Sequence, residues 1–161
     1  MIIMEKASKE DAKNLLQIQK DAFAVYAAKY GDFDSNPYHM DLHRMEFNIQ
    51  YRFGQYYKIL DADTQQLIGG LFCFELDDQE IMKIAQFYFI PAYQHLGYGS
   101  VALTQLFNQN PMVKKWFVDT ILQEEYNVSF YQHMGFEIID EEEEHEGLNF
   151  VTLLKKVEPI Q

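Results

Sequence analysis

Cysteine, glycine, proline and basic residues are all scarce in this chain of 161 residues. The single cysteine, Cys73, excludes an intramolecular disulfide, and its apolar neighbours favour a buried thiol in a reducing compartment. No run approaches the roughly 20 apolar residues of a membrane-spanning helix, and residues 1–6 lack the pattern of a signal peptide. We therefore expect a cytoplasmic protein with no membrane partner.

Positively charged residues are also few. Lysine and arginine number 13 against 25 aspartates and glutamates, a net charge of −12. A protein of that sign repels a phosphate backbone, so nucleic acid is excluded as a partner. The composition is 48% hydrophobic and 16% aromatic, which is enough for a core and unlike a disordered chain. The length predicts a single domain over residues 1–161.

The apolar pattern predicts an α/β fold, or α+β by a stricter definition. We expect about seven strands, at 2–6, 56–60, 67–76, 82–90, 116–121, 136–139 and 148–157. We expect four helices: one between a Ser8–Asp11 capping box and the 31–37 loop, one from Pro37 to about Arg52, one ending near Gln109, and one ending near Met134 before Gly135. A strand–helix–strand unit among hairpins implies a mixed, mostly antiparallel sheet with helices on both faces.

Two polar features have simple interpretations. The acidic run Asp140–Glu146 is typical of a solvated hairpin tip, because like charges stay hydrated. His39 and His43 lie four residues apart on the expected second helix, but no third ligand accompanies them at a zinc-site spacing. We expect them to be surface histidines and expect no metal.

The segment 87–100 is the most informative in the chain. Gly97 and Gly99 stand at a strand-to-helix junction, where a tight turn and a helix N-terminus can point several N–H groups at one phosphate. Residues 84–113 contain no Asp, Glu, Lys or Arg, which suits an anion site built from backbone dipoles. A plain glycine turn is the simpler alternative.

A dinucleotide site is one possible interpretation of these glycines. Residues 97–102 fit the pattern G-x-G-x-x-A, and Asp119 lies 20 residues beyond Gly99. However, that turn needs its first glycine directly after the strand, whereas six residues, including Pro91, intervene here. The chain also offers too few strand–helix units for a nucleotide-binding sheet, so we disfavour this interpretation.

The second interpretation takes Gln94-x-x-Gly97-x-Gly99 as the motif, preceded by Ile90-Pro91 and followed by the segment 129–136, Ser-Phe-Tyr-Gln-His-Met-Gly-Phe. These motifs and the order of elements over residues 2–157 resemble the GNAT superfamily of acyl-CoA-dependent N-acetyltransferases. The resemblance implies transfer of acetyl from acetyl-CoA (coenzyme A) to a primary amine of a small molecule or peptide. Attack would be direct, in a ternary complex without metal or acyl-enzyme, and a homodimer is compatible with the family.

The resemblance also assigns roles to residues. Backbone groups of Phe87 and Phe89 would pair with the pantetheine arm, and the Phe89 N–H would polarise the thioester carbonyl. Tyr131 would protonate the departing thiolate. A phenol, whose pKa is ordinarily about 10, can donate a proton in this way. The motif begins at Gln94, and the amides that would hold the pyrophosphate are those of His95, Leu96, Gly97, Tyr98, Gly99 and Ser100.

Some positions depart from the family pattern or leave roles open. Glu124 stands where the family often has Asn, and His95 where Gly, Lys or Arg is more usual. Candidates for a general base, by position only, are Glu75, Gln86 and Glu124. A non-catalytic sensor of acyl-CoA on the same fold is therefore the alternative function.

The resemblance further points to the acceptor. In the family the last hairpin, here with the acidic run 140–146, and the loop between the first two helices, here with Asp32 and Asp34, border the acceptor site. A polycationic amine, such as a polyamine, an aminoglycoside or a basic peptide terminus, would be attracted to that rim.

Ligand-induced stabilisation separates the two phosphate interpretations. We expect acetyl-CoA, at 100 times its dissociation constant, to stabilise the fold by about 2.7 kcal/mol, visible as a higher melting midpoint. NAD under identical conditions should leave the midpoint unchanged. A shift with NAD alone would overturn the acetyltransferase resemblance.

Overall fold

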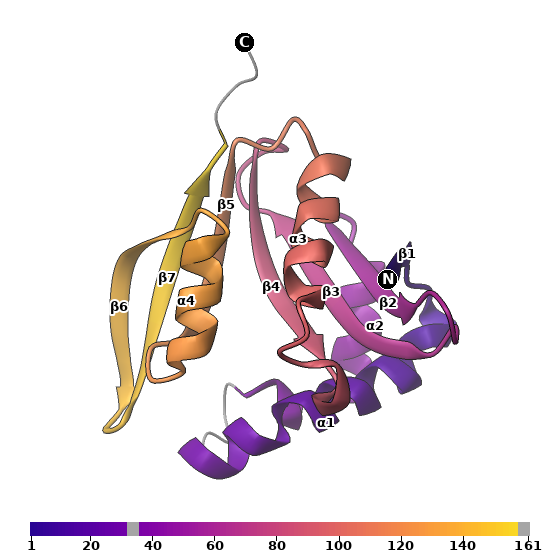
Figure 1. Cartoon of the computed structure of the whole chain (residues 1–161), viewed down its shortest axis with the longest axis horizontal. Coiled ribbons are helices and arrows are strands. Elements are labelled where there is room, and N and C mark those ends of the chain that lie inside the picture. Colours follow the sequence, from indigo (N-terminus) through magenta and orange to yellow (C-terminus); the bar gives the residue numbers. More distant parts are fainter. Residues whose placement is uncertain (32–35, 158–161) are drawn as a thin grey trace. The chain divides into compact units, whose positions relative to one another are not determined.

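The structure is a computed structural model that describes residues 1–31 and 36–157 (Figure 1). The strands are β1 (Ile2–Lys6), β2 (Gly54–Asp61), β3 (Leu67–Glu75), β4 (Ile81–Phe89), β5 (Lys115–Ile121), β6 (Glu137–His145) and β7 (Leu148–Lys156). The α-helices in the described chain are α1 (Ala12–Tyr30), α2 (Leu42–Gln50), α3 (Tyr98–Gln109) and α4 (Glu125–His133). Short 3₁₀ turns occupy Lys9–Asp11 (η1), Pro37–His39 (η2) and Pro91–Tyr93 (η3).

The seven strands hydrogen-bond in the order β1-β2-β3-β4-β5-β7-β6. The β4–β5 pair is parallel, whereas β1–β2, β5–β7 and β6–β7 are antiparallel. The expected mixed, mostly antiparallel fold is therefore confirmed. Backbone contacts divide the chain into two compact units: unit 1 contains residues 1–73 and 86–106, and unit 2 contains residues 74–85 and 107–161.

Unit 1 is organised around the long helix α1. Asp11 accepts hydrogen bonds from the Ser8 N–H (2.8 Å) and hydroxyl (3.2 Å), so the expected helix start is confirmed. Gly31, with φ of +59°, ends the helix in the left-handed conformation. Between these ends α1 buries residues at helical spacing against α2 and η2, namely Ala12, Leu15, Gln19, Ala22 and Ala27.

The second helix starts later than predicted. We expected it to begin at Pro37, but η2 occupies that position and the side chain of Asn36 accepts from the Tyr38 N–H. Met40 is extended, and α2 then begins at Leu42 because Asp41 accepts from the Arg44 N–H (2.8 Å) as its cap. Two competing caps thus divide the predicted helix.

Between two hydrogen bonds that flank the β3–β4 hairpin, the β4 side holds one residue more than the β3 side. At one end of this hairpin the Leu76 N–H donates to Ile81 O, and at the other the Ile90 N–H donates to Ile68 O. These bonds are eight residues apart along β3 and nine apart along β4. The extra residue is a β-bulge, and it reverses the direction in which the following peptide groups of β4 point.

Two glycines of β3 accommodate the bulged part of β4. A Cβ added at Gly69 would lie 2.4 Å from the backbone oxygen of Tyr88, and one at Gly70 would lie 2.4 Å from its hydroxyl. The Tyr88 side chain therefore crosses β3 over a glycine and reaches Tyr56 on β2, where the two buried hydroxyls hydrogen-bond to each other. Burial raises the pKa of both tyrosines, so both remain neutral.

Unit 2 is built on the β5–β7–β6 part of the sheet. The parallel β4–β5 pairing covers Ile81–Ile84 of β4, and β5 pairs with β7 along its whole length. Buried side chains from β5, β7 and α4 form its core, where Trp116 packs near Phe107 and Phe136 packs against Tyr131. Gly135, with φ of +96°, ends α4 as predicted.

The acidic run is a strand and not a hairpin tip. Strand β6 includes Asp140–Glu144, and all nine of its residues are exposed. The prediction was wrong because a backbone can pair with β7 on one side while every carboxylate stays in water. β6 is the edge strand, and its two register irregularities together with its like charges oppose pairing with another edge.

Two further sequence expectations concern Cys73 and membrane spans. Cys73 lies inside β3, is fully buried, and burial raises the pKa of its thiol to about 12, which confirms an inert core thiol. Across residues 1–31 and 36–157, no helix has both the length and the apolar character required to cross a bilayer.

The buried tyrosine pair gives a stability prediction. Tyr56→Phe should lower the free energy of unfolding by about 1–3 kcal/mol, because it leaves the Tyr88 hydroxyl buried without a partner. The double variant Tyr56→Phe/Tyr88→Phe should recover most of that loss, since neither hydroxyl then needs one. Urea unfolding of the wild type, both single variants and the double variant checks this, and strictly additive losses would contradict it.

Candidate functional site

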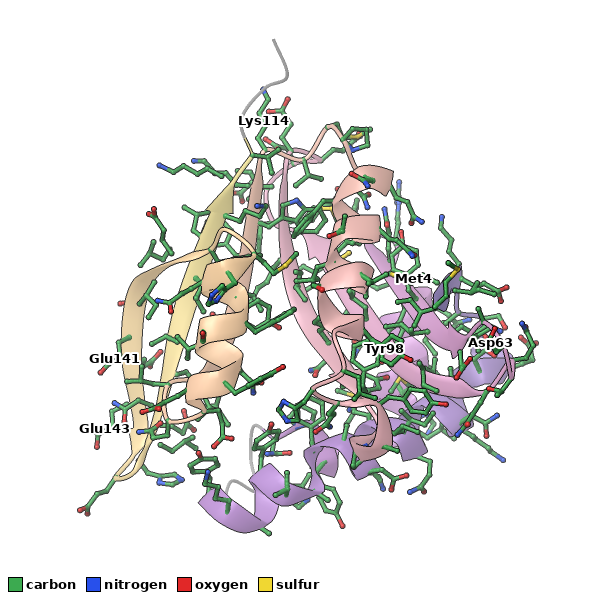
Figure 2. All side chains as sticks on the ribbon, in the orientation of Figure 1. Met4, Asp63, Tyr98, Lys114, Glu141 and Glu143 are labelled. Carbon is green, nitrogen blue, oxygen red and sulfur yellow. The ribbon has the colours of Figure 1, made fainter. Side chains whose placement is uncertain are left out.

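The predicted phosphate-binding loop leaves β4 through η3 and enters α3. His95 and Gly97 both have left-handed backbones, with φ of +60° and +86°. Helix α3 then begins at Tyr98, which is labelled in Figure 2. The first N–H groups of a helix have no partner within it, so the amides of Tyr98, Gly99 and Ser100 face back toward the loop. Glycine suits position 97 because it has no Cβ to be strained at a positive φ.

Three side-chain hydrogen bonds hold this loop in unit 1. Gln94 Nε2 donates to Phe89 O (2.8 Å), Ser100 Oγ donates to Gly97 O (3.0 Å), and the Tyr93 hydroxyl donates to Asp61 Oδ2 (2.8 Å). The last bond lowers the pKa of Asp61 and raises that of Tyr93. The loop is thus tied to the end of β4 and to the β2–β3 turn.

The shape and chemistry of the loop fit a diphosphate. A Cβ at Gly97 would meet no heavy atom within 4 Å other than those of the residue itself and its two chain neighbours. Leu96 and Gly97 are exposed, and the absence of carboxylates from residues 84–113 removes the closest source of repulsion. Backbone amides at a helix start are well suited to bind an anion under these conditions.

The end of β4 presents peptide groups on the edge opposite β3. Because the Ile90 N–H bonds to β3, strand alternation directs the peptide groups of Phe89 to the other edge. The Phe89 carbonyl accepts from Gln94 there. The Phe89 ring lies 5.6 Å from that of Phe87 and 6.4 Å from that of Tyr98, measured between centroids.

Tyr131 lies on α4, in unit 2. It is 7% exposed, and its ring packs against those of Phe130 and Phe136 at 5.2 and 5.5 Å. Burial raises the pKa of its hydroxyl above the ordinary value for tyrosine. The group therefore stays protonated and available as a donor.

Other sequence candidates are distributed over both units. Gln86 lies on β4 in unit 1, whereas Glu75 ends β3 and Glu124 immediately precedes α4, both in unit 2. Asp32 and Asp34 lie outside the described residues. The general base therefore stays open among these positions.

The structure does not favour the dinucleotide interpretation or a shared role for His39 and His43. Asp119 lies inside β5, and its two oxygens bond to Lys83 Nζ and Thr152 Oγ1, each at 2.7 Å. His39 belongs to η2 and His43 to α2, so they do not share a helix face as expected. Among the described residues, no group of three or more His, Cys, Asp or Glu side chains could hold a metal.

Two supporting residues were missed in the sequence. Asp61 lies in the connection between the expected strands 56–60 and 67–76, and Tyr88 lies within the expected strand 82–90, yet one anchors Tyr93 and the other fixes the bulged end of β4. The glycine pair 69–70 inside a predicted strand was the signal that could have found Tyr88, since glycine there marks a bulge or close approach.

Comparison with known proteins defines the family. The sequence profile described as Acetyltransferase (GNAT) family matches residues 13–136. The fold matches the ribosomal-protein-S18-alanine N-acetyltransferase of Escherichia coli with a TM-score of 0.80, at 11% identity over 100% of this chain and 97% of that one. It also matches the PaiA N-acetyltransferase of Thermoplasma acidophilum, solved with coenzyme A, with a TM-score of 0.71, at 17% identity over 98% and 99%.

A third solved structure is a spermidine N-acetyltransferase SpeG chimera from Vibrio cholerae and hSSAT, with a TM-score of 0.76 and 14% identity over 96% and 95% of the two chains. No curated protein matches the sequence closely enough to serve as a relative. The fold and the profile together define a class, the acyl-CoA-dependent acetyltransferases. The chain belongs to the GNAT acetyltransferase family, whose acetyl donor is acetyl-CoA.

Gly97 allows a matched test of the loop. Gly97→Ala and Gly147→Ala should each destabilise the protein by about 1 kcal/mol, because both glycines have positive φ and open space around a Cβ. Only Gly97→Ala should also weaken coenzyme A binding, since Gly147 lies at the β6–β7 turn. Urea unfolding measures the stability of each variant, and calorimetric titration measures its affinity for coenzyme A. Equal coenzyme A affinities of the two variants would contradict the assignment of the loop.

Proposed function

We propose that this protein transfers an acetyl group from acetyl-CoA to a primary amine of a small molecule or peptide, by direct attack in a ternary complex. The observation that carries the proposal is the loop 94–100. Gln94 of this loop hydrogen-bonds to the carbonyl of Phe89, the last residue of β4, and the space beside Gly97 is free. Membership in the family supports acetyl transfer in general.

Two groups of this chain would act on the reacting atoms. Acetyl-CoA supplies an acetyl group activated as a thioester. The Phe89 N–H, on the edge of β4 opposite β3, would donate to the carbonyl oxygen as negative charge develops on it. Backbone groups of Phe87 and Phe89 would align the pantetheine arm, and the amides from His95 to Ser100 would bind the pyrophosphate.

Tyr131 would supply the proton that the departing sulfur needs. The raised pKa of its hydroxyl keeps the proton on the oxygen at neutral pH and above, so that a proton is in place when the carbon–sulfur bond breaks. The amine must lose one proton when its nitrogen bonds to the acetyl carbon and the carbon–sulfur bond breaks. Glu75, Gln86 through a water, or Glu124 would receive it.

The acceptor we propose is a primary amine that can carry several positive charges. Two similar structures bear the names of acetyltransferases for spermidine and for the S18 alanine, which are a polyamine and a peptide amine. The net charge of −12 supports attraction of such a substrate. The buried, unpaired Cys73 suits a reducing compartment, so we place the reaction in the cytoplasm.

Tyr131→Phe tests the enzyme against the sensor alternative. Turnover with acetyl-CoA and a panel of primary amines should fall about 100-fold, while the dissociation constant of acetyl-CoA stays unchanged. Tyr126→Phe is the control, because Tyr126 lies on the same helix and is 57% exposed. A wild-type protein that binds acetyl-CoA but acetylates no amine would instead favour the sensor.

A further inference from the structure

Helix α2 in unit 1 carries an exposed aromatic cluster on its outer side. Arg44 and Phe47 lie three residues apart on α2, and Tyr51, Arg52 and Phe53 follow at its C-terminal end. The Phe47 ring stacks on that of Tyr51 at 5.7 Å between centroids, and the Phe53 ring lies 6.0 Å from that of Tyr51. Phe47 is 54% exposed and Phe53 is 49% exposed. These five residues form a surface that we call the α2 patch.

Both arginines of the chain belong to the α2 patch. Arg44 Cζ lies 5.2 Å from the centre of the Phe47 ring, and Arg52 Cζ lies 5.4 Å from that of Phe53. Within residues 1–31 and 36–157, neither guanidinium forms an ion pair with a carboxylate. Residues 42–60 contain three Lys and Arg and one Glu, although the chain as a whole carries −12. Because aromatic rings and arginine dominate protein contacts, and arginine pairs well with carboxylates, the α2 patch fits an acidic surface with apolar side chains.

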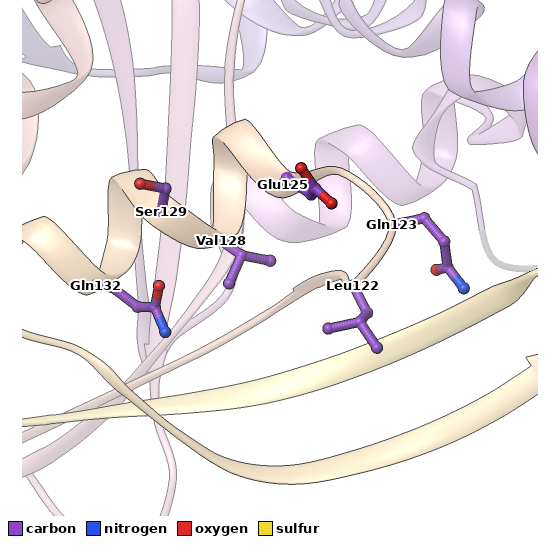
Figure 3. A pocket seen from close by; sticks show the side chains of 6 residues that line it. All are labelled: Leu122, Gln123, Glu125, Val128, Ser129 and Gln132. Carbon is purple, nitrogen blue, oxygen red and sulfur yellow. The ribbon is translucent and has the colours of Figure 1, made fainter.

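The sheet of unit 2 has one face that a helix covers. Val118 of β5 pairs with Leu153 of β7, and both are buried. Lys155 shares this face with Leu153, because it lies two residues further along β7. Its Nζ donates to Met134 O at the end of α4 (2.7 Å). Val128 of α4, which is 8% exposed, points toward the strands in Figure 3, so α4 lies over this face.

The other face of the same sheet is not buried. Alternate residues of a strand point to opposite faces, and cross-strand partners share a face. The pairs Phe117–Leu154, Asp140–Thr152 and Glu142–Phe150 therefore lie opposite α4. We call this surface the open face: it consists of Phe117 on β5, Phe150, Thr152 and Leu154 on β7, and Asp140 and Glu142 on β6. The β5 and β7 residues are only partly buried, although three of them are large and apolar.

The open face also carries unpaired negative charge. Lys83 pairs with Asp119 on this side of the sheet, at 2.7 Å, so its charge is neutralised. Asp140 and Glu142 are exposed, and in the part of the chain that the structure describes they form no ion pair. The open face thus combines partly exposed apolar side chains with carboxylates at its edge, and these properties complement those of the α2 patch.

We propose that the α2 patch of one copy of this protein docks on the open face of a second copy. The patch and the two carboxylates are exposed in the single chain, so both are accessible to another molecule. The guanidinium groups meet Asp140 and Glu142, and the aromatic rings cover the apolar part of the face, as a helix ordinarily covers a sheet. Contact between two identical surfaces would bring like charges together, which disfavours it. The contact is independent of the proposed acetyl transfer.

Sedimentation velocity over a range of protein concentrations tests the proposal. The wild type should form assemblies larger than one chain. Arg44→Glu/Arg52→Glu and Asp140→Arg/Glu142→Arg should each weaken self-association about tenfold or more, because like charges then meet. The variant with all four substitutions keeps the net charge of −12, since the two pairs change it equally in opposite directions. It should associate again, because the charges of both surfaces are exchanged.

Glu141→Arg/Glu143→Arg is the matched control on the same strand. Glu141 pairs with Val151 and Glu143 with Asn149, so both share the face on which α4 lies, and both project from β6 in Figure 2. This variant changes the net charge as much as Asp140→Arg/Glu142→Arg does. It should leave self-association unchanged, whereas equal weakening by the two variants would show that net charge alone is responsible and would overturn the proposal.

Phe47→Ser tests the apolar part of the contact. Because Phe47 is exposed, the substitution should weaken self-association at an unchanged melting midpoint. Val25→Ser is its control, since Val25 lies on α1 and is 61% exposed, and it should have no effect. A wild type that sediments as a single chain at every concentration, or a fourfold variant that does not recover association, would overturn the proposal. None of these results bears on acetyl transfer.

Discussion

The close approach of β4 to β3 is the constraint on which the candidate loop depends. Gly69 and Gly70 leave no Cβ between the strands, so the Tyr88 carbonyl and ring can lie directly over β3. This approach accompanies the extra residue in β4, and the peptide groups of Phe89 consequently face the edge opposite β3. Gln94 bonds to the Phe89 carbonyl, and this bond joins the loop to the strand.

Charge is distributed unevenly along the chain, and the distribution suits the proposed pyrophosphate loop. Residues 84–113 contain no acidic or basic side chain, although the chain as a whole carries −12. An anion can approach backbone amides only where carboxylates are absent. Residues 116–154, in contrast, contain ten Asp and Glu and no Lys or Arg, and one of these carboxylates, Asp119, pairs with Lys83 of β4.

Low sequence identity to the similar structures limits what the fold implies. The matched proteins share 11–17% of their residues with this chain, yet their folds agree over nearly the whole length. Core packing and strand order can be kept by many sequences, whereas an acceptor site depends on a few particular side chains. The acetyl donor is therefore a property of the family, and the acceptor is a property of this chain.

Local signals in the sequence determined much of the fold. Ser8 and Asp11 begin α1, Gly135 ends α4, and strand periodicity locates the strands except for the acidic part of β6, because each of these effects acts over a few neighbouring residues. The loop glycines likewise identify the candidate phosphate site, since the turn they form is also local. The start of α2 was missed because two caps, Asn36 and Asp41, compete within six residues.

Tertiary structure decided what depends on partners distant in the chain. The acidic run 137–145 becomes a strand only because β7 offers a backbone to pair with, which no local pattern reveals. The hydrogen bonds from Tyr93 to Asp61 and between Tyr56 and Tyr88 each join residues 32 positions apart. Such contacts arise from the folded arrangement of elements, and sequence spacing alone does not encode them.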